Sequence, residues 1–548
     1  MTSERRGFAG HPLVLGGLLV ILLGQMLAAS RLKSPTFDEP AHIGAGFSYL
    51  KTGQFKVNLQ HPPLLKEIGA LPLLLIGARW PMSEKDWEAV GVPSEPWVQW
   101  SLGEDVIFGN DASRVMFSTR LPFMLLTVLL GILIYAWGRK ILGRGAAAGA
   151  LLLFALDPTI VAHGQLVAMD VGFAAFGFLF LYALWSYLNH RSLRRLLGCG
   201  LALGAALATK FSAVVLLPLA AILVLAASRW IPEAVPRRPS SLADPYASDD
   251  GGQRIVWCVY AIVSLVLVAA VLIYALYFFP ANPFLYVEGM QLVNADHDAS
   301  YWPYMAGHFQ PSFWTYYAVA YLLKEPIPTL LLVAFGILAL LRRGAAATLD
   351  RVFLLLPPAL LFLVHALFSH NLGFRYVIPA LPFLYLVGGA GLRWLWGERS
   401  PWRRVAAVTL CAWLPVGAAG IYPDHLSYFN ELACLLAAPG RVGLDGGTRC
   451  GPLWLDDSNV DWGQGMLQLK SWLDRNAPGR PVRLAYFGSM RPEMYGLTGV
   501  KIGLQELEEP ARPGLYAVSA HLLARAIGRL SMGGGGGEAG WLLRTRPT

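Results

Sequence analysis

Charged residues are scarce in this chain. Only 14% of its 548 residues are Asp, Glu, Lys or Arg, whereas 55% are hydrophobic, and soluble globular proteins are roughly 25% charged. This composition excludes a cytosolic globular enzyme and a disordered chain. Cysteine is scarce as well. Its five residues form no CxxC pair and no Cys/His metal spacing, which excludes a disulfide-rich secreted module.

The apolar residues form runs long enough to cross a bilayer, which takes about 20 residues per helix. The sequence therefore predicts a polytopic α-helical membrane protein. About eleven spans are expected, at residues 12–30, 121–138, 145–162, 166–188, 196–209, 211–228, 255–280, 313–341, 352–369, 374–396 and 405–421. The span at 313–341 is interrupted by Lys324-Glu325-Pro326 and is expected to break there.

Basic residues predict the orientation, because Lys and Arg collect in the cytoplasmic loops of membrane proteins. The net charge is +9. When the spans alternate, every basic cluster falls on one side, at residues 5–6, 139–144, 191–195, 229–254, 342–351 and 399–404. The N-terminus is then cytoplasmic, and residues 31–120, 281–312 and 422–548 are on the outer side.

The chain divides into a membrane domain at residues 1–421 and a small extracytoplasmic α/β domain at residues 422–548. Within the first outer loop, 31–120, an apolar stretch at 64–78 is short for a span and predicts an interfacial helix. In the C-terminal domain we expect strands at 482–487 and 515–518 and a helix at 464–473. Cys434 and Cys450 fall on the outer side, where a disulfide can form.

Ionisable residues near membrane spans are costly and mark functional sites. Here they gather on the predicted outer surface, together with one tyrosine: Asp38, Glu39, His42, His61, Asp157, His163, Asp170, Lys210, His370, Arg375 and Tyr376. A carboxylate beside an apolar surface suits general-base work, and Lys and Arg at lipid depth suit a phosphate on a lipid carrier. The set predicts group transfer from a lipid-linked phosphate to an acceptor on the outer surface.

Each residue also has a structural alternative. Asp38 could cap the helix that begins near Pro40. Asp157-Pro158 could be only a turn, and His61-Pro62-Pro63 only a rigid start to the interfacial helix. Lys210 could extend to the headgroups. Their common position on one surface favours function for the set more than for any member.

Three motifs resemble a known family. Phe37-Asp38-Glu39 with His42, then His61-Pro62-Pro63-Leu64, and then Leu156-Asp157-Pro158 with Asp170 are similar to the dolichyl-phosphate-mannose-protein mannosyltransferase superfamily, whose bacterial relatives include the lipid A aminoarabinose transferases. The resemblance covers residues 10–400. It implies a GT-C fold and an inverting glycosyltransferase that uses a polyprenyl-phosphate sugar.

By this resemblance Asp38 is the catalytic base, and Glu39 is the second acid, which positions a substrate. Asp157 and Asp170 lie near the sugar, and Arg375 and Lys210 hold the lipid phosphate; His42, His163, His370 and Tyr376 complete the predicted donor- and acceptor-binding set.

This chain departs from the aminoarabinose transferases at two positions. His61 replaces their Lys before Pro-Pro, and Gln60 replaces their metal-binding Glu. The departure argues against aminoarabinose as the donor sugar. No metal ligand is assigned, although a divalent metal stays open because family members differ.

The segment 456–464, Asp-Asp-Ser-Asn-Val-Asp-Trp-Gly-Gln, is densely acidic. It lacks the spacing of an EF-hand, so an Asx turn and N-cap before the following helix is preferred over a Ca²⁺ site. It resembles the tails of bacterial members of the superfamily, which implies a bacterial inner membrane.

The expected partners are a polyprenyl-phosphate sugar, membrane lipids, and a protein or glycolipid acceptor, with no nucleic acid. Two other classes of function stay open. A transporter or lipid flippase would place functional charges at the membrane midplane and show inverted repeats. A non-catalytic envelope assembly protein would need its outer tail but not Asp38 or Glu39.

Overall fold

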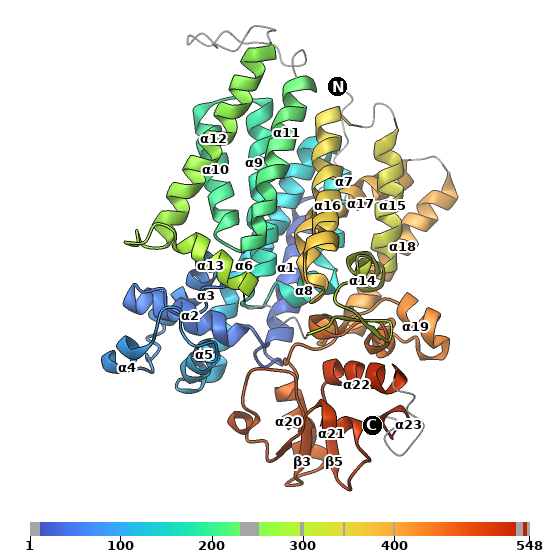
Figure 1. Ribbon diagram of the computed structural model, residues 1–548. Coiled ribbons are helices and arrows are strands. Elements are labelled where there is room, and N and C mark those ends of the chain that lie inside the picture. The colour runs from blue at the N-terminus through green and yellow to red at the C-terminus, as the bar shows by residue number, and fades with distance from the viewer. Residues whose placement is uncertain are drawn as a thin grey trace.

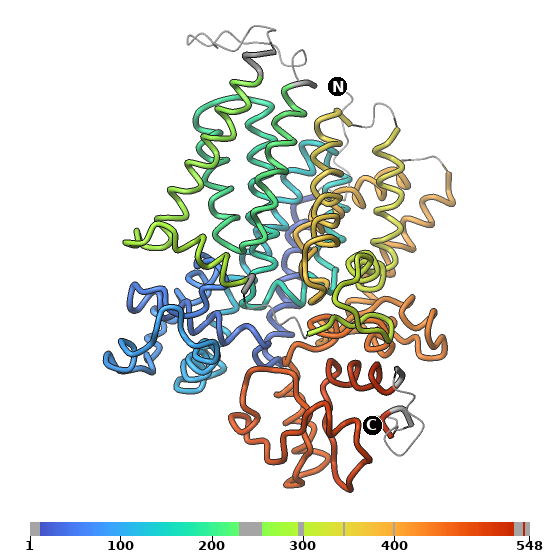
Figure 2. The backbone as a smooth tube through the Cα atoms, in the orientation of Figure 1, coloured from blue at the N-terminus to red at the C-terminus, as the bar shows by residue number. Residues whose placement is uncertain are grey.

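The structure is a computed structural model that describes residues 11–230, 251–295, 301–342, 346–397, 400–532 and 541–544. It is a bundle of long helices with a smaller unit of helices and strands at one end (Figure 1). The backbone passes up and down the bundle repeatedly before it enters the smaller unit (Figure 2). A polytopic helical protein was expected, and the structure confirms it.

Seven of the described helices are long and apolar enough to cross a membrane. They are α1 (Pro12–Ser30), α6 (Ala112–Ile141), α9 (Met169–Asn189), η2 with α11 (Phe211–Val215 and Leu216–Trp230), α12 (Gly251–Leu276), α16 (Thr348–Phe368), and η3 with α17 (Phe374–Ala380 and Leu381–Gly397). The helices α14 (Tyr316–Lys324) and α15 (Ile327–Leu341) pass the same test together but are bent by 114°, so they form a broken span or a re-entrant loop. The bend falls at the predicted interruption, because Pro326 lacks a backbone N–H and favours the extended conformation seen at Glu325.

Of the roughly eleven predicted spans, seven or eight meet the length and hydropathy of a membrane-crossing helix in the described chain, so the exact number of spans stays a prediction. Three further helices complete the bundle: α7 (Arg144–Ala155), α10 (Leu193–Leu207) and α18 (Pro401–Gly420). The predicted span at 145–162 is two helices, α7 and the short α8 (Pro158–His163), because Asp157 caps α8 and Pro158 fills its first position.

The predicted inner and outer segments lie at opposite ends of the bundle. The α6–α7 and α9–α10 connections, which carry the basic residues, lie at the end where α1 begins, and the first loop, α13 (Leu285–Ala295) and the C-terminal unit lie at the other (Figure 1). Residues 5–6, 231–250, 343–345 and 398–399 of the basic clusters are outside the described residues. Which end faces the cytoplasm stays a prediction.

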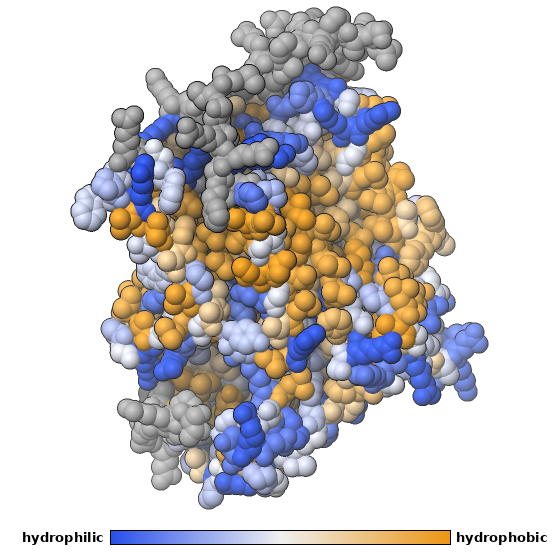
Figure 3. All heavy atoms as spheres, turned by 180° about the vertical axis from the view of Figure 1, so that it is seen from behind, coloured by the Kyte–Doolittle hydropathy of each residue, from blue (hydrophilic) through white to orange (hydrophobic). Residues whose placement is uncertain are grey.

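The middle of the bundle presents apolar side chains to its surroundings. The face opposite the view of Figure 1 shows an apolar zone between two more polar ends (Figure 3). On α6 the exposed residues include Leu125, Leu129 and Ile132, which recur at helical spacing. A soluble protein would bury such a zone, so this is a multi-pass membrane protein.

The first outer loop folds into four helices: α2 (Glu39–Thr52), α3 (Leu64–Leu75), α4 (Glu84–Ala89) and α5 (Val98–Phe108). The helix expected at 64–78 is confirmed as α3. Helices α2 and α5 approach so closely that a Cβ atom at Gly103 would overlap the Pro40 carbonyl oxygen, so only glycine fits there. The Lys66 ammonium is fully buried and donates to the carbonyl oxygens of Asn58 and His61, at 2.6 and 2.7 Å. These bonds fix the loop that carries His61.

The C-terminal unit contains a three-stranded parallel sheet in the order β4–β3–β5. Its strands are β3 (Val482–Ala485), β4 (Gly499–Lys501) and β5 (Leu515–Val518), and its main helices are α20 (Met466–Asn476) and α22 (Ala520–Met532). Val482 and Leu484 pack with α20, whereas Ala485 packs with α22, so the strand alternates between two covered faces. Both predicted strands and the helix are confirmed within a few residues. β4 was missed because its three residues are all exposed.

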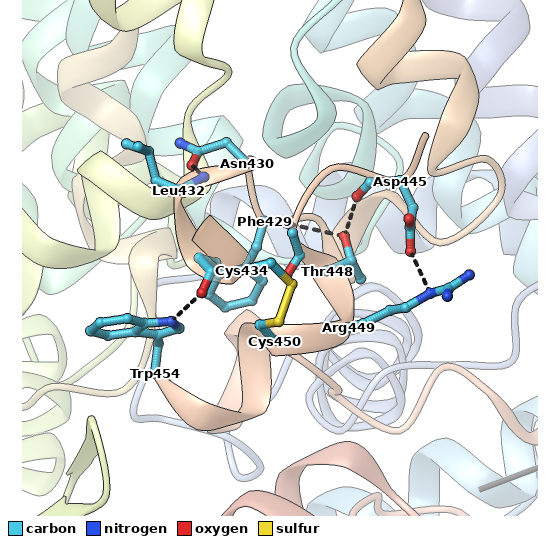
Figure 4. Close-up of a disulfide and its surroundings, with 11 residues drawn as sticks. Phe429, Asn430, Leu432, Cys434, Asp445, Thr448, Arg449, Cys450 and Trp454 are labelled. Atoms are coloured by element: carbon cyan, nitrogen blue, oxygen red, sulfur yellow. Dashed lines mark hydrogen bonds and ion pairs between the residues drawn. A yellow bond between two sulfur atoms is a disulfide. The ribbon is translucent and has the colours of Figure 1, made fainter. Parts of the chain in front are cut away.

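The sequence left open whether Cys434 and Cys450 are bonded, and the structure joins Cys434 in α19 (Leu432–Ala437) to Cys450 by a disulfide (Figure 4). Both cysteines are fully buried. Beside them the Trp454 indole N–H donates to the Ala433 carbonyl oxygen at 2.7 Å. The disulfide and this bond therefore join two parts of the connection between α18 and the α/β unit to one another.

Candidate active site

Glu39 and Arg120 hold the loop between α1 and α2 in place. The Glu39 carboxylate is fully buried and pairs with Arg120 of α6, with Nη2···Oε2 at 2.6 Å and Nε···Oε1 at 2.8 Å. It also accepts from the backbone N–H groups of Thr36 and Val167, at 2.8 and 3.1 Å. Arg120 in turn donates to the Ser34 carbonyl oxygen at 3.0 Å. Burial raises the pKa of Glu39, but the Arg120 charge and these bonds outweigh it and leave the pKa below its usual value.

Asp38 follows this anchored loop and faces a cation. Its Oδ2 accepts from Arg375 Nη1 at 3.0 Å, and its side chain is 24% exposed. Asp38 stands at the N-cap position of α2, yet its side chain makes no capping hydrogen bond. The alternative of a simple helix cap is therefore wrong. A carboxylate that is held by one cation and still reached by solvent can exchange a proton with a bound hydroxyl.

Arg375 lies in η3, at the start of the span that continues into α17. Besides Asp38, its guanidinium lies over the Trp462 ring, 4.2 Å from the centroid, and near the Tyr376 ring at 5.6 Å. Its Nε is buried and has no hydrogen-bond partner among the described residues. A guanidinium with an unused donor is suited to a bidentate phosphate or carboxylate ligand.

A second ion pair lies beside the first. Lys210 Nζ, at the start of η2, donates to Asp170 Oδ1 in the first turn of α9 at 2.7 Å. Lys210 also lies over the Tyr376 ring, 4.3 Å from its centroid. Its side chain is only 11% exposed, so it does not extend to the headgroups. Tyr376 thus has both predicted phosphate cations, Lys210 and Arg375, near its ring.

His42 and His61 form a neighbouring pair of rings, 5.2 Å apart and edge to face. His42 Nδ1 contacts the Val167 carbonyl oxygen at 2.8 Å, so His42 lies beside the backbone that also binds Glu39. Burial, followed by the positive charges of His42 and Lys66, lowers the pKa of His61 well below its usual value. His61 is therefore neutral near pH 7, and it meets an anion as an N–H donor rather than as a cation.

Of the remaining predicted residues, His163 lies within electrostatic reach of Asp170, Arg375 and Lys210, whereas Asp157 and His370 have other surroundings. His163 ends α8 and packs near Trp462, with ring centroids 6.2 Å apart. Asp157 caps α8 by accepting from Thr159 N at 2.8 Å, and its carboxylate lies against that of Glu325 at the α14–α15 bend. The hydrogen bond from Thr159 agrees with the structural alternative, in which Asp157-Pro158 forms a turn. Asp157 is not a member of either ion pair. The side chain of His370 is exposed.

The acidic segment 456–464 connects the two loops that carry Asp38 and Arg375. Phe37 N donates to the Trp462 carbonyl oxygen at 2.8 Å on one side. On the other side Phe374 N donates to Asn459 Oδ1 at 2.8 Å. The predicted Asx turn is present, since Asp461 Oδ1 accepts from Gly463 N at 2.9 Å. The segment was expected to belong to a separate domain, but it lies within the site.

Three features of the site were not predicted from the sequence: Arg120, Asn459 and the contact between Trp462 and Arg375. Arg120 had a signal, because it is a lone cation at the edge of an apolar run. No sequence signal indicated the role of Trp462, apart from its place in the acidic segment.

Within the described ranges no cluster of three or more His, Cys, Asp or Glu side chains is arranged to hold a metal ion. The acids of segment 456–464 have protein partners instead. Asp456 pairs with Arg525 of α22 at 2.7 Å, and the Asp457 backbone N–H donates to His521 Nδ1 at 2.8 Å. These contacts attach α22 to the bundle.

Residues 94–238 match the family described as dolichyl-phosphate-mannose-protein mannosyltransferase. The match confirms the resemblance over that part of the chain. No curated protein matches this chain in sequence.

Several solved structures are similar in fold. ArnT from Cupriavidus metallidurans in the apo state is 14% identical, with 89% of this chain and 85% of that chain covered and a TM-score of 0.47. The archaeal oligosaccharyltransferase AglB from Archaeoglobus fulgidus is 12% identical, covering 84% and 58%, with a TM-score of 0.42. The S. cerevisiae protein O-mannosyltransferase Pmt1-Pmt2 complex is 19% identical, covering 51% and 33%, with a TM-score of 0.30.

Proposed function

We propose that this protein is an inverting glycosyltransferase of the bacterial inner membrane, which moves a sugar from a polyprenyl phosphate to a hydroxyl acceptor on the outer side. The observation that carries the proposal is the Asp38–Arg375 pair, a partly exposed carboxylate 3.0 Å from a guanidinium that has an unused donor. The family matched over residues 94–238 is described by a donor of this class.

The cations fit a lipid phosphate. Arg375 lies at the start of a membrane span and Lys210 at the start of η2, so both are at the end of the bundle where a lipid phosphate would sit. The donor phosphate would accept from Arg375 Nε and from Lys210, with His61 as a neutral N–H donor. Charge-assisted bonds of this kind are the strong ones, worth about 1.5–3 kcal/mol each.

The reaction follows from the same contacts. The acceptor O–H gives its proton to Asp38 as its oxygen forms a bond to the anomeric carbon of the sugar. The bond from that carbon to the phosphate oxygen breaks, and its electron pair stays on the polyprenyl phosphate. Arg375 and Lys210 stabilise the charge that develops there. Attack from the face opposite the phosphate inverts the anomeric carbon.

The ion pair also suggests how Asp38 becomes an active base. While Arg375 binds Asp38, the contact at 3.0 Å occupies carboxylate Oδ2, which would otherwise be open to an acceptor hydroxyl. A phosphate on Arg375 competes for the same cation and releases Asp38 toward the acceptor. Donor binding would then precede activation of the acceptor.

Trp462 acts here as a positioning residue. Its ring covers one face of the Arg375 guanidinium, and its carbonyl oxygen accepts from Phe37, next to Asp38. It therefore fixes both members of the pair relative to one another.

The positions of the charges favour an enzyme over a transporter. Asp170 is in the first turn of α9, and Asp38, Lys210 and Arg375 precede or begin helices at the same end of the bundle. A transporter is expected to carry its functional charges near the midplane. An assembly protein would need no carboxylate-guanidinium pair with an unused donor.

The test is transfer or hydrolysis of a radiolabelled polyprenyl-phosphate sugar by the purified protein. Asp38→Asn should lower turnover by about 10²–10⁴-fold, the usual contribution of a general base, with unchanged unfolding temperature. Asp105→Asn, which removes an exposed carboxylate from the same outer loop, is the matched control. Near-normal turnover in Asp38→Asn would refute the assignment of the base, and lipid movement without cleavage would indicate a flippase.

A further inference from the structure

A cavity of about 750 Å³ lies beside the site, where the end of α1, the start of α6 and the C-terminal unit meet. Its walls come from residues 30–35, from the α5–α6 region at 107–117, and from Leu467, Lys470, Met494 and Tyr495 of the C-terminal unit. None of Asp38, Arg375, Asp170 or Lys210 lines it. It is therefore a feature separate from the two ion pairs.

The charged side chains in the lining are all cationic. Arg31, Lys33, Arg114 and Lys470 line the cavity, and its lining includes no Asp or Glu. Lys33 already pairs with Asp424, and Lys470 with Asp474. In the part of the chain that the structure describes, the guanidinium groups of Arg31 and Arg114 have neither a hydrogen bond nor an ion pair. Two exposed guanidinium groups at one opening favour an anionic ligand.

The rest of the lining is apolar and leads into the membrane zone. Met116 and Phe117 of α6 line the cavity. Phe117 is 37% exposed, and farther along the same helix Leu125, Leu129 and Ile132 are exposed too. Their spacing places them along one side of α6. An apolar stripe thus runs from the cavity along the part of α6 that crosses the membrane.

The length of α6 puts the cavity at headgroup depth. The helix has 30 residues, about 45 Å at 1.5 Å per residue, whereas the hydrocarbon core of a bilayer is about 30 Å thick. Because Arg139 and Lys140 end the apolar part of the helix on the far side, about 20 residues counted back from them span the hydrocarbon and leave the first turns outside it. Arg114 is in the first turn, and Phe117 is one turn farther in, so the boundary between charged and apolar lining falls where a headgroup meets its acyl chains.

We propose that this cavity binds an anionic membrane phospholipid, with the phosphate diester at Arg31 and Arg114 and the acyl chains along the apolar stripe of α6. The cavity's inner wall, residues 30–35, is the segment that Arg120 holds beside Asp38. A bound lipid would pack against the outer side of that segment. The site does not depend on sugar transfer, so it can hold even if the proposed function fails.

The experiment is native mass spectrometry of the full-length protein released from nanodiscs that contain phosphatidylcholine and phosphatidylglycerol in equal amounts. Wild type should retain one phosphatidylglycerol in preference to phosphatidylcholine. The double variant Arg31→Gln/Arg114→Gln should retain it about tenfold less or lower still, since each basic residue near an anionic surface contributes roughly 1 kcal/mol. Both residues are exposed, so the folded yield should not change.

The matched control is Arg139→Gln/Arg194→Gln, which removes two exposed arginines from the other end of the bundle. Retention in this control should equal that of wild type. Equal retention of phosphatidylcholine and phosphatidylglycerol by wild type would overturn the proposal, because charge would not select the lipid. Unchanged retention in the Arg31/Arg114 variant, or an equal loss in the control, would also overturn it.

Discussion

Replacing Glu39 by Gln should destabilise the protein rather than slow the chemistry directly. The Glu39 side chain is fully buried, and its carboxylate accepts five hydrogen bonds, two from Arg120, two from Thr36 and one from Val167. Glu39→Gln removes the counter-charge of the buried Arg120. Breaking a buried ion pair in this way costs about 3–5 kcal/mol.

The assay is thermal unfolding of the detergent-solubilised protein, followed by tryptophan fluorescence, with turnover measured on the fraction that remains folded. For a chain of 548 residues that unfolds as one unit, a loss of about 3–5 kcal/mol corresponds to a fall in Tm of about 3–4 °C. The control is Asp474→Asn, which removes an exposed partner of Lys470 and should cost less than about 1 kcal/mol. A double-mutant cycle of Glu39→Gln with Arg120→Met should show strong coupling, since the residues are in contact.

The pH dependence adds a second readout. The pKa of Glu39 is lowered in the folded protein, so its contribution to stability is present above the unfolded value of about 4.5 and is lost as the pH falls through the folded value. Glu39→Gln should therefore lose less stability than wild type on acidification below pH 4.5. If Glu39→Gln keeps its Tm but loses turnover, Glu39 acts on the reactants and the anchoring role is refuted.

Three further outcomes are expected. Trp462→Ala should raise the KM for the donor by freeing the Arg375 side chain, whereas Trp462→Phe should restore most of the affinity; a fall in kcat alone, with KM unchanged, would contradict the positioning role. Serine at both Cys434 and Cys450 should lower stability by about 3 kcal/mol, the chain-entropy value for a loop of about 15 residues, and melting curves that superimpose on wild type would refute this. Burial raises the pKa of Glu67 from 4.5 in the unfolded chain to about 7 in the folded protein. The contribution of Glu67 to folding stability is therefore fully present below pH 4.5 and is lost as the pH rises toward 7. Glu67→Gln should flatten the decline in Tm between pH 5 and 8, and an unchanged slope would contradict the raised pKa of Glu67.

Hydropathy and local signals predicted the features that depend on near neighbours in the chain. The long apolar runs gave most of the helices, and Lys324-Glu325-Pro326 gave the bend, because proline acts on adjacent backbone. The single helix predicted at 145–162 is two helices in the structure, because the capping signal of Asp157-Pro158 outweighs the apolar composition there.

The site could be predicted only in part, because its residues pair across long distances in the sequence. Asp38 and Arg375 could each be singled out as a charge near a span, but 337 positions separate them in the sequence, and only the fold brings them into contact. The same holds for Glu39 with Arg120, 81 positions apart. The motif that contains Asp38-Glu39 predicted two catalytic acids, yet the structure gives them different surroundings, because only Glu39 faces a buried cation.

The most direct test of the central claim is a cryo-EM structure of the wild-type protein with undecaprenyl phosphate bound. The account predicts phosphate oxygens within about 3 Å of the Arg375 guanidinium and of Lys210, with the Asp38–Arg375 contact opened. An ordered phosphate bound elsewhere, while Arg375 still holds Asp38 at its present distance, would contradict the assignment of this pair as the centre of sugar transfer.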